Sequence, residues 1–212
     1  MLKNKIYLIF IALAALFVGL YFFNLKQHKP LKTLPYFDPK SYSKAKVREH
    51  HIIPVFSFIN QYNQRVTEQA TKQKVYVTDF FFTSCQSICP IMSHQLERVY
   101  KEFKPRNDFI ILSHTVNPET DSVPQLLKYA KQHGVTDTRW MFLTGDKKQL
   151  YELARKGYLL NAEEGNGDAN DFIHTQNFAL IDKEKHIRGF YDGTDSTEVT
   201  RLINDIHVLF EE

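Results

Sequence analysis

Two cysteines carry the most specific chemical signal in this chain. Cys85 and Cys89 lie in Thr83-Ser-Cys-Gln-Ser-Ile-Cys-Pro90, after the apolar run 75–82 and before an amphipathic stretch. This order places both thiols where a strand passes into a helix. A helix N-terminus offers unpaired backbone N–H groups and the positive end of the helix dipole, and both stabilise a thiolate. The pattern therefore predicts a reactive or metal-binding pair rather than two structural thiols.

The spacing of the pair leaves two kinds of chemistry open. Thioredoxin-type redox enzymes use Cys-x-x-Cys, whereas Cys85 and Cys89 have three residues between them. A step of four residues brings both sulfurs to the same side of the first helical turn. Their Cα atoms can then fall within the roughly 4.4 to 6.8 Å that a disulfide requires. If the pair stays reduced, two thiolates form a soft donor set that selects Cu(I) over hard cations.

The elements that must position these thiols alternate along the chain as in an α/β fold with a central sheet. The last two strands form a β-hairpin, and the final helix follows it. This order predicts a thioredoxin-like domain with an N-terminal extension and an inserted hairpin and loop. The predicted strands cover residues 51–58, 75–82, 108–116, 140–145, 176–182 and 186–191, and the predicted helices cover 90–103, 123–133, 146–156 and 196–210.

A third copper donor is sought among the nine histidines of the chain. An imidazole suits copper in either oxidation state, Cu(I) or Cu(II). His174 precedes the strand 176–182, and in a thioredoxin-like topology the loop entering that strand packs against the cysteine loop. Thioredoxins place a cis-proline there, but no proline follows Pro124 in this chain. We therefore expect Cys85, Cys89 and His174 to form a copper site.

The remaining histidines are less suited to that role. His94 lies one turn into the predicted helix, on a face that points away from the thiols, and His114 is expected to bond to backbone groups at the end of a buried strand. Met92 is a soft sulfur near the motif, but its helical register with Leu96 predicts a core position. His133 is expected to be exposed to solvent, as are His28, His186 and His207.

The N-terminus reads as a membrane anchor. No charged residue occurs from Ile6 to Phe23, a run long enough to cross a bilayer core of roughly 30 Å. No small-x-small cleavage motif follows, so residues 1–25 are predicted to be an uncleaved anchor, with a cleaved signal peptide as the alternative. A short basic N-terminus normally stays inside, so the soluble domain is expected on the extracytoplasmic, periplasmic-type side of the membrane.

Between the anchor and the domain, residues 26–47 carry three prolines and several lysines, and they are predicted to form an extended tether that lifts the domain off the membrane. Residues 48–212 then form a single copper-binding domain. The net charge of +3 is too small and too scattered to indicate a nucleic-acid partner.

Four segments in this order resemble the SCO/SenC family, the membrane-tethered thioredoxin-like copper chaperones of respiratory oxidase assembly. They are Asp79-Phe-Phe-Phe-Thr-Ser-Cys-Gln-Ser-Ile-Cys-Pro90, Thr115-Val-Asn-Pro-Glu-Thr-Asp121, Trp140-Met-Phe-Leu-Thr-Gly145, and His174-Thr-Gln-Asn-Phe-Ala-Leu-Ile-Asp182 with Tyr191-Asp-Gly193. The resemblance covers about residues 50 to 210.

This resemblance assigns the family's copper ligands to Cys85, Cys89 and His174. It implies a non-enzymatic metallochaperone that delivers copper to the binuclear site of a cytochrome c oxidase subunit, or reduces the cysteines of that site before metallation. Its partners would be the apo copper-site subunit and other periplasmic copper or thiol-redox proteins. Two positions depart from the family pattern: Gln86 stands where proline is usual, and Asn117 stands where aspartate is usual. Gln86 removes a fixed φ and could loosen the thiol loop.

Two other functions use the same fold. A membrane-anchored thiol-disulfide oxidoreductase would need only the cysteines, with Cys85, the more exposed, attacking first. A peroxidase of the peroxiredoxin type would need a threonine and an arginine beside the reactive cysteine, and only Thr83 lies close in the sequence. If His174 is a copper ligand, the chaperone function is favoured over both the oxidoreductase and the peroxidase.

Overall fold

Seven strands form one mixed sheet in the order β2-β1-β5-β4-β3-β6-β7. The computed structural model describes residues 33–39, 50–160, 173 and 175–212. The strands are β1 Ser57–Asn60, β2 Arg65–Thr67, β3 Val75–Phe81, β4 Phe109–Thr115, β5 Trp140–Thr144, β6 Asn177–Ile181 and β7 Ile187–Asp192. This mixed sheet confirms the α/β, thioredoxin-like architecture expected from the sequence.

Strand direction gives the sheet two distinct ends. β3, β4 and β5 run parallel, while β6 pairs antiparallel with β3 and β7 pairs antiparallel with β6. The carboxyl ends of the three parallel strands therefore meet at one end of the sheet, where β6 begins and β7 ends. Loops at that end carry the functional residues in most open α/β sheets.

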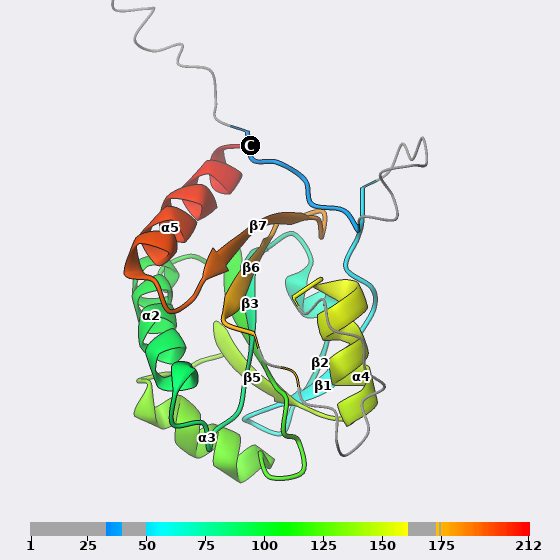
Figure 1. The fold of residues 1–212 in the computed structure, drawn as a ribbon, viewed down its shortest axis with the longest axis vertical. Helices are drawn as coiled ribbons and strands as arrows, with labels where there is room; N and C mark the ends of the chain where they lie inside the picture. Colours follow the sequence, from blue (N-terminus) through cyan, green and yellow to red (C-terminus); the bar gives the residue numbers. More distant parts are fainter. Residues whose placement is uncertain (1–32, 40–49, 161–172, 174) are drawn as a thin grey trace, which may run out of the picture. The chain divides into compact units, whose positions relative to one another are not determined.

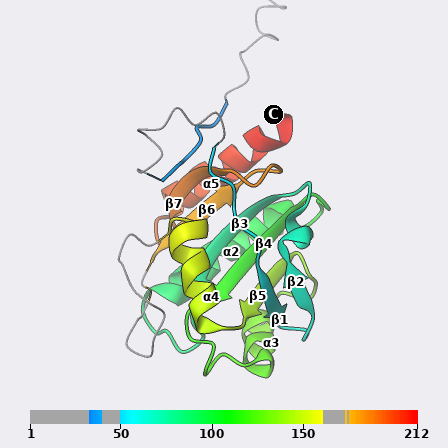
Figure 2. The same cartoon turned by 90° about the vertical axis from the view of Figure 1, so that its right-hand side faces the viewer.

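Helices cover both faces of this sheet. The chain forms α2 Ile88–Phe103, α3 Val123–Gln132, α4 Lys147–Glu152 and α5 Ser196–Glu211, with a 3₁₀ turn, η2 Glu68–Thr71, and a π turn, η3 Leu153–Gly157. Figure 1 shows α2, α3 and α5 on one side of the sheet and α4 on the other, and Figure 2 shows α4 in front of the strands. Each face is closed by its own hydrophobic core.

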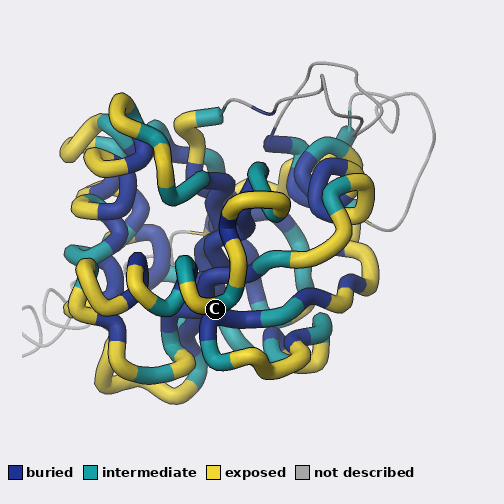
Figure 3. The backbone as a smooth tube through the Cα atoms, turned by 90° about the horizontal axis from the view of Figure 1, so that it is seen from below, coloured by how far each residue is buried: buried dark blue, intermediate teal, exposed yellow. Residues whose placement is uncertain are grey.

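The most buried elements are those whose sequence is apolar without interruption. All seven residues of β3 and all seven of β4 are buried, because helices cover both sides of these strands. α2 buries a single face, which includes Met92, Leu96 and Val99, as its helical spacing predicts. Figure 3 shows the buried strands as a dark blue band through the centre of the domain.

Residues 33–39, which we name the strap, lie against the domain. Leu34 is only 5% exposed and belongs to the core on the α2 and α5 side. The backbone N–H of Phe37 donates to the carbonyl of Ile187 at the start of β7 (3.0 Å). The compact unit accordingly runs from Thr33 to Glu212. This part of the predicted tether is therefore packed on the domain, so the packed region begins before residue 48.

Several predicted boundaries shift. The first strand is shorter than 51–58 because Pro54 cannot donate to a sheet ladder, and pairing begins at Ser57. The helix predicted over 146–156 has Asp146 as its N-cap, as expected, but it passes into the π turn η3 after Glu152. The hairpin and the last helix are confirmed within a residue or two.

Within the described residues, no helix is long and apolar enough to cross a membrane. The predicted anchor, residues 1–25, lies outside the described residues, as do residues 26–32 and 40–47 of the predicted tether.

Candidate functional site

The sulfur of Cys85 takes the place of a helix cap. α2 begins at Ile88 and Ser87 occupies its N-cap position, but the Ser87 side chain makes no capping hydrogen bond. Instead, the backbone N–H of Cys89 donates to the Cys85 sulfur at 3.4 Å. The Cys85 backbone N–H in turn donates to the carbonyl of Phe82 (3.2 Å), which folds the loop back over the helix start. The predicted junction of strand, thiols and helix is thus present.

The two thiols sit in unequal environments. Cys85 is partly exposed and Cys89 is buried, with 3% of its surface accessible. Burial alone would raise the pKa of Cys85, but hydrogen bonds from the Cys89 thiol, the Cys89 N–H and Ser87 outweigh it and hold the pKa below its ordinary value. Burial raises the pKa of Cys89 to about 12, assisted by its bond to Cys85. These surroundings therefore favour the thiolate at Cys85 and the protonated thiol at Cys89.

A buried carboxylate lies beneath the pair. Asp79, on β3, is 1% exposed and accepts a hydrogen bond from the Ser113 hydroxyl, which itself accepts one from the Trp140 indole at 2.8 Å. Burial raises the pKa of Asp79 to about 7 despite the bond from Ser113. Its charge adds to the elevation of the Cys89 pKa. Asp79 belongs to the motif that carries the family resemblance, but its role could not be inferred from the residues around it in the chain.

The thiol loop is fastened to the next strand by Asp121. This fully buried carboxylate accepts hydrogen bonds from the Thr83 N–H (3.2 Å) and the Thr83 hydroxyl (2.6 Å), and another from the Thr115 hydroxyl at the end of β4. Gln125 on α3 donates to the Thr83 hydroxyl (3.2 Å). The Thr83 hydroxyl and N–H are therefore used in structural hydrogen bonds. A peroxidase requires instead a threonine that is available to activate peroxide.

The predicted third ligand, His174, lies outside the described residues, but the residues that follow it reach the thiol end of the sheet. β6 begins at Asn177, and its pairing of Ala179 with Thr78 places that start beside the carboxyl end of β3. Gly193 donates its N–H to the carbonyl of Gln176 (2.7 Å), which fixes this entry segment against the end of β7. In the described part of the chain, no three His, Cys, Asp or Glu side chains are grouped to hold a metal ion. The described part of the site therefore provides two possible metal donors, the sulfurs of Cys85 and Cys89.

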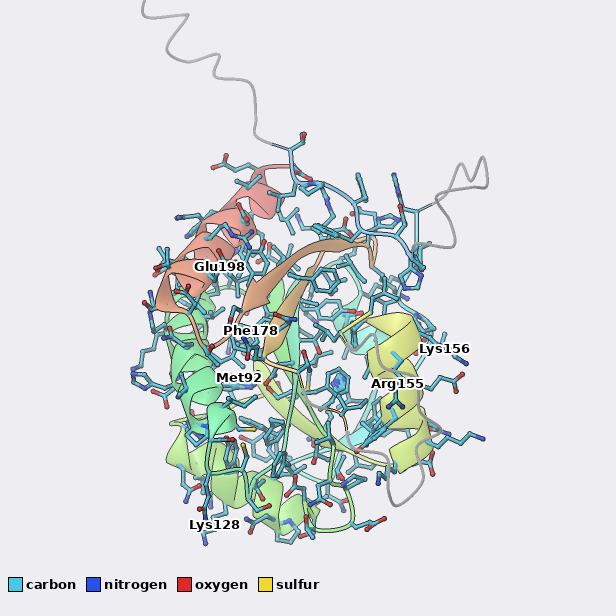
Figure 4. All side chains as sticks on the ribbon, viewed as in Figure 1. Met92, Lys128, Arg155, Lys156, Phe178 and Glu198 are labelled. Carbon is cyan, nitrogen blue, oxygen red and sulfur yellow. The ribbon has the colours of Figure 1, made fainter. Side chains whose placement is uncertain are left out.

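The other sulfur and imidazole groups lie away from the pair. Met92 is fully buried and points from α2 towards the sheet, as predicted (Figure 4). His94 is exposed on α2 beside Glu97 (3.4 Å). His133, expected in solvent, is instead half-buried and bonded to Glu97 at 2.9 Å, because α3 packs beside α2.

His114 also differs from its expected environment. It is fully buried, and neither ring nitrogen has a hydrogen-bond partner among the described residues. Phe80, Tyr158 and Phe58 surround the ring, with centroids 5.1 to 5.6 Å away. This apolar environment lowers its pKa to about 3, so the imidazole is neutral. The expected bonds to backbone groups are absent because the backbone groups of β4 are used in the sheet.

Comparison with known proteins agrees with this geometry. The family model described as SCO1/SenC matches residues 44–211. A curated relative, the SCO1 protein homolog of Bacillus subtilis (strain 168), is 31% identical over 153 residues, which cover 71% of this chain and 79% of the relative.

Two solved structures share the fold. One is BsSco, a member of the Sco family of cytochrome c oxidase assembly proteins in which a disulfide switch was identified; it is 26% identical, with a TM-score of 0.66, and the match covers 84% of this chain and 98% of BsSco. The other is Arabidopsis thaliana ScoI with copper bound, which is 25% identical with a TM-score of 0.60, over 76% of this chain and 99% of ScoI. With its paired cysteines at the start of α2 and this sheet order, the chain belongs to the SCO1/SenC family.

Proposed function

We propose that the protein is a membrane-attached copper chaperone for the assembly of a respiratory cytochrome c oxidase. In this proposal Cys85, Cys89 and His174 hold Cu(I), which is the cargo. The copper passes by ligand exchange to the binuclear copper site of the apo-oxidase subunit. Two related proteins support the proposal, because one is a structure with copper bound and the other is a member of a family of oxidase assembly proteins.

The observation that carries the proposal is the arrangement of the Cys85 sulfur. It is exposed enough to be reached by a partner, and the Cys89 N–H and Ser87 favour its thiolate form. Cys89 lies beside it and supplies a second sulfur after losing its proton. Copper binding should therefore release about one proton from Cys89 at neutral pH. A two-sulfur site that is open on one side can be joined by a third donor or by the ligands of a partner.

Anaerobic titration of the full-length chain with Cu(I), followed by X-ray absorption, tests the proposal. We expect one copper per chain, bound by two sulfurs and one nitrogen. His174→Ala should lose the nitrogen and weaken binding at least tenfold, whereas the matched control His94→Ala should bind as the wild type does, because His94 is exposed on α2. Absence of stoichiometric binding, or an unchanged ligand count in His174→Ala, would contradict the assignment.

A second function, thiol-disulfide exchange, is favoured by the unequal thiols. The Cys85 thiolate would attack a partner disulfide and form a mixed disulfide, releasing one partner thiolate. Cys89, on losing its proton, would then attack the Cys85 sulfur and release the second partner thiolate. The pair gains a disulfide as the partner gains two electrons. This function requires Cys85 and Cys89 but not His174, so oxidase assembly that survives His174→Ala and fails in Cys89→Ser would favour it over copper transfer.

A further inference from the structure

The strap and the thiols lie at opposite ends of the sheet. The strap bonds to Ile187, which is paired with Ile181, and Ile181 is paired with Tyr76 at the start of β3. Cys85 follows the other end of β3. A strand of this length rises about 3.3 Å per residue, so the two ends are about 20 Å apart before the loops are added. We name them the strap pole and the thiol pole; Figure 1 shows the strap, in blue, beside the C-terminal end of α5.

A buried arginine holds the strap in place. Arg188, 4% exposed, donates to the carbonyls of Leu34 (2.7 Å) and Pro35 (3.2 Å) and lies 4.2 Å from the centre of the Tyr36 ring. The same guanidinium is neutralised by Glu212 at 2.7 Å, and Asp182 pairs with it as well. The Glu212 carboxylate also accepts the Leu34 N–H (2.8 Å). Burial of Arg188 and Leu34, together with several bonds to one planar group, makes this a defined docking site for the strap.

The strap pole has an apolar surface. Tyr36 is 44% exposed, Phe37 is 36% exposed and Ile52 is 50% exposed. They are neighbours, because Ile52 bridges to His186 and the Tyr36 ring packs edge-on against the same histidine. Lys183 and Lys185 flank Glu184 in the adjoining β6–β7 turn. Exposed aromatic side chains next to lysines are typical of surfaces that lie at a membrane interface.

The loops of the thiol pole have the opposite character. The charged residues of the described segments 82–87, 117–122, 145–146 and 193–195 are all acidic; Glu119, Asp146 and Asp195 are exposed, and Asp121 is buried. An anionic lipid surface would repel this pole.

The length of chain before the strap limits how far the domain can move from a membrane. About nine residues separate the uncharged run that ends at Phe23 from Thr33, and fully extended they span about 30 Å. If the strap were undocked, the free chain would continue to His50 and reach about 90 Å. Docking of the strap thus shortens the free chain between the uncharged run and the domain roughly threefold. It also means that this free chain joins the domain at the strap pole.

We infer that the strap pole rests on the lipid bilayer and that the thiol pole faces away from it. The inference rests on the membrane attachment within the proposed function. The distance of the thiols from the bilayer would then be about the length of the domain. The copper site of the partner would have to lie at the same distance from the bilayer.

Quenching by lipid tests this orientation in the full-length chain. A fluorophore is attached to a single cysteine, Glu184→Cys at the strap pole or Glu119→Cys at the thiol pole, in a chain that also carries Cys85→Ser and Cys89→Ser. Both glutamates are exposed turn residues, so labelling leaves the core intact. The chain is placed in nanodiscs of phosphatidylcholine and phosphatidylglycerol that contain a quencher on the lipid headgroup. We expect quenching at residue 184 to exceed that at residue 119 at least threefold.

Surface variants show whether the apolar residues of the strap pole are responsible. Tyr36→Ser with Phe37→Ser should reduce the quenching at residue 184 by at least half, whereas Ile91→Ser, which removes a 48% exposed apolar side chain near the thiols, should leave it unchanged. Circular dichroism checks that each variant is folded. Equal quenching at the two positions, or stronger quenching at residue 119, overturns the orientation. A chain that does not co-purify with the discs overturns membrane attachment itself, and copper titration then tests the rest of the proposed function separately.

Discussion

At the scale of single residues, the site depends on two sulfurs whose pKa values are shifted in opposite directions. Cys85 and Cys89 are adjacent, yet hydrogen bonds lower the pKa of one and burial raises the pKa of the other to about 12. The thiolate is the form that binds metals and attacks disulfides. The difference therefore determines which sulfur reacts first in either proposed function.

Alkylation of single-cysteine variants measures this difference. At pH 7, Cys89→Ser, which retains Cys85, should react with iodoacetamide at least tenfold faster than Cys85→Ser, which retains Cys89, because the remaining Cys89 thiol is protonated and buried. The rate for the retained Cys85 should reach half its maximum below pH 9.0, the ordinary value for a thiol, and that for Cys89 should still rise at pH 10. Equal rates at pH 7 would show that the environment of the pair is not as described.

Asp79 makes stability depend on pH. Its pKa is about 7 in the folded state, compared with an ordinary value of 3.8, so the folded protein binds a proton more tightly than the unfolded chain does. Its contribution to stability is therefore largest below pH 4 and is lost as pH rises to 7. A shift of about three units corresponds to roughly 3 to 4 kcal/mol for a fully buried group.

Asp79→Asn should remove this dependence, because asparagine still accepts the Ser113 hydrogen bond but carries no charge. In urea unfolding at pH 8, the variant should be more stable than the wild type by up to roughly 3 kcal/mol, and the two should converge near pH 4. The matched control Glu184→Gln changes an exposed carboxylate and should show no such pH-dependent gain. A constant difference between pH 4 and 8 would contradict a titrating Asp79.

At the scale of secondary-structure elements, the site is assembled by loops at the ends of three neighbouring strands. The thiol loop follows β3, the Asp121 loop follows β4, and the segment that follows His174 leads into β6. Gly193, at the end of β7, bonds to Gln176 and leaves no room for a side chain: an added Cβ would lie 2.5 Å from the Phe178 ring and 2.9 Å from the Gln176 carbonyl oxygen. The backbone near His174 is thus positioned by contact with this glycine.

Gly193→Ala should displace residues 175–177 and weaken copper binding. We expect at least a tenfold loss in Cu(I) affinity by competition titration and a loss of about 1 to 3 kcal/mol in stability, since Cβ cannot be fitted without moving the backbone. Gly134→Ala is the matched control: it costs about 1 kcal/mol because Gly134 has a φ of 69°, but an added Cβ there meets nothing within 4 Å. Its copper affinity should equal that of the wild type.

Most elements could be predicted from the sequence because their signals are local. The buried strands β3 and β4 are continuous apolar runs, α2 repeats apolar residues on one face, and the Lys183–Lys185 turn marks the hairpin. The predicted start of α2 is two residues too late, because the N–H of its second residue, Cys89, is capped by a sulfur from outside the helix rather than by a standard N-cap residue.

Features that depend on distant residues could not be predicted. The strap reads as an exposed, proline-containing linker until Arg188, about 150 residues later, supplies the donors that bind it. Likewise, the roles of Asp79 and Asp121 depend on partners on β4, and the apolar environment of His114 is formed by three separate segments, which contribute Phe56 and Phe58, Phe80, and Tyr158. The position of the two cysteines between β3 and the start of α2 was predicted correctly, because it depends on the local segment 82–90 alone.

At the scale of the whole molecule, Arg188 connects the strap to the rest of the domain. Its buried guanidinium bonds to two carbonyls of the strap and to the carboxylates of Asp182, which is buried, and Glu212, which is not. Removal of one partner from such a network leaves buried charges without compensation.

Arg188→Lys should destabilise the domain by about 2 to 4 kcal/mol in urea unfolding, because a single ammonium cannot reach all the acceptors that the planar guanidinium serves. The control Arg98→Lys changes a surface arginine bonded to Gln95 and Thr200 and should cost no more than about 0.5 kcal/mol. Protease cleavage after Phe37 should accelerate in the first variant only. Similar costs for both substitutions would show that the strap contributes nothing to stability.

The contact between Leu34, Arg188 and Glu212 also sets an order of events during synthesis. Leu34 leaves the ribosome early, but its carbonyl and N–H are bound by residues made about 150 and 178 positions later. The nascent domain must therefore remain on a long, unfastened connection until Glu212 has been translated. The strap can therefore dock only after both Arg188 and Glu212 have been made, so its packing on the domain is a late step of folding.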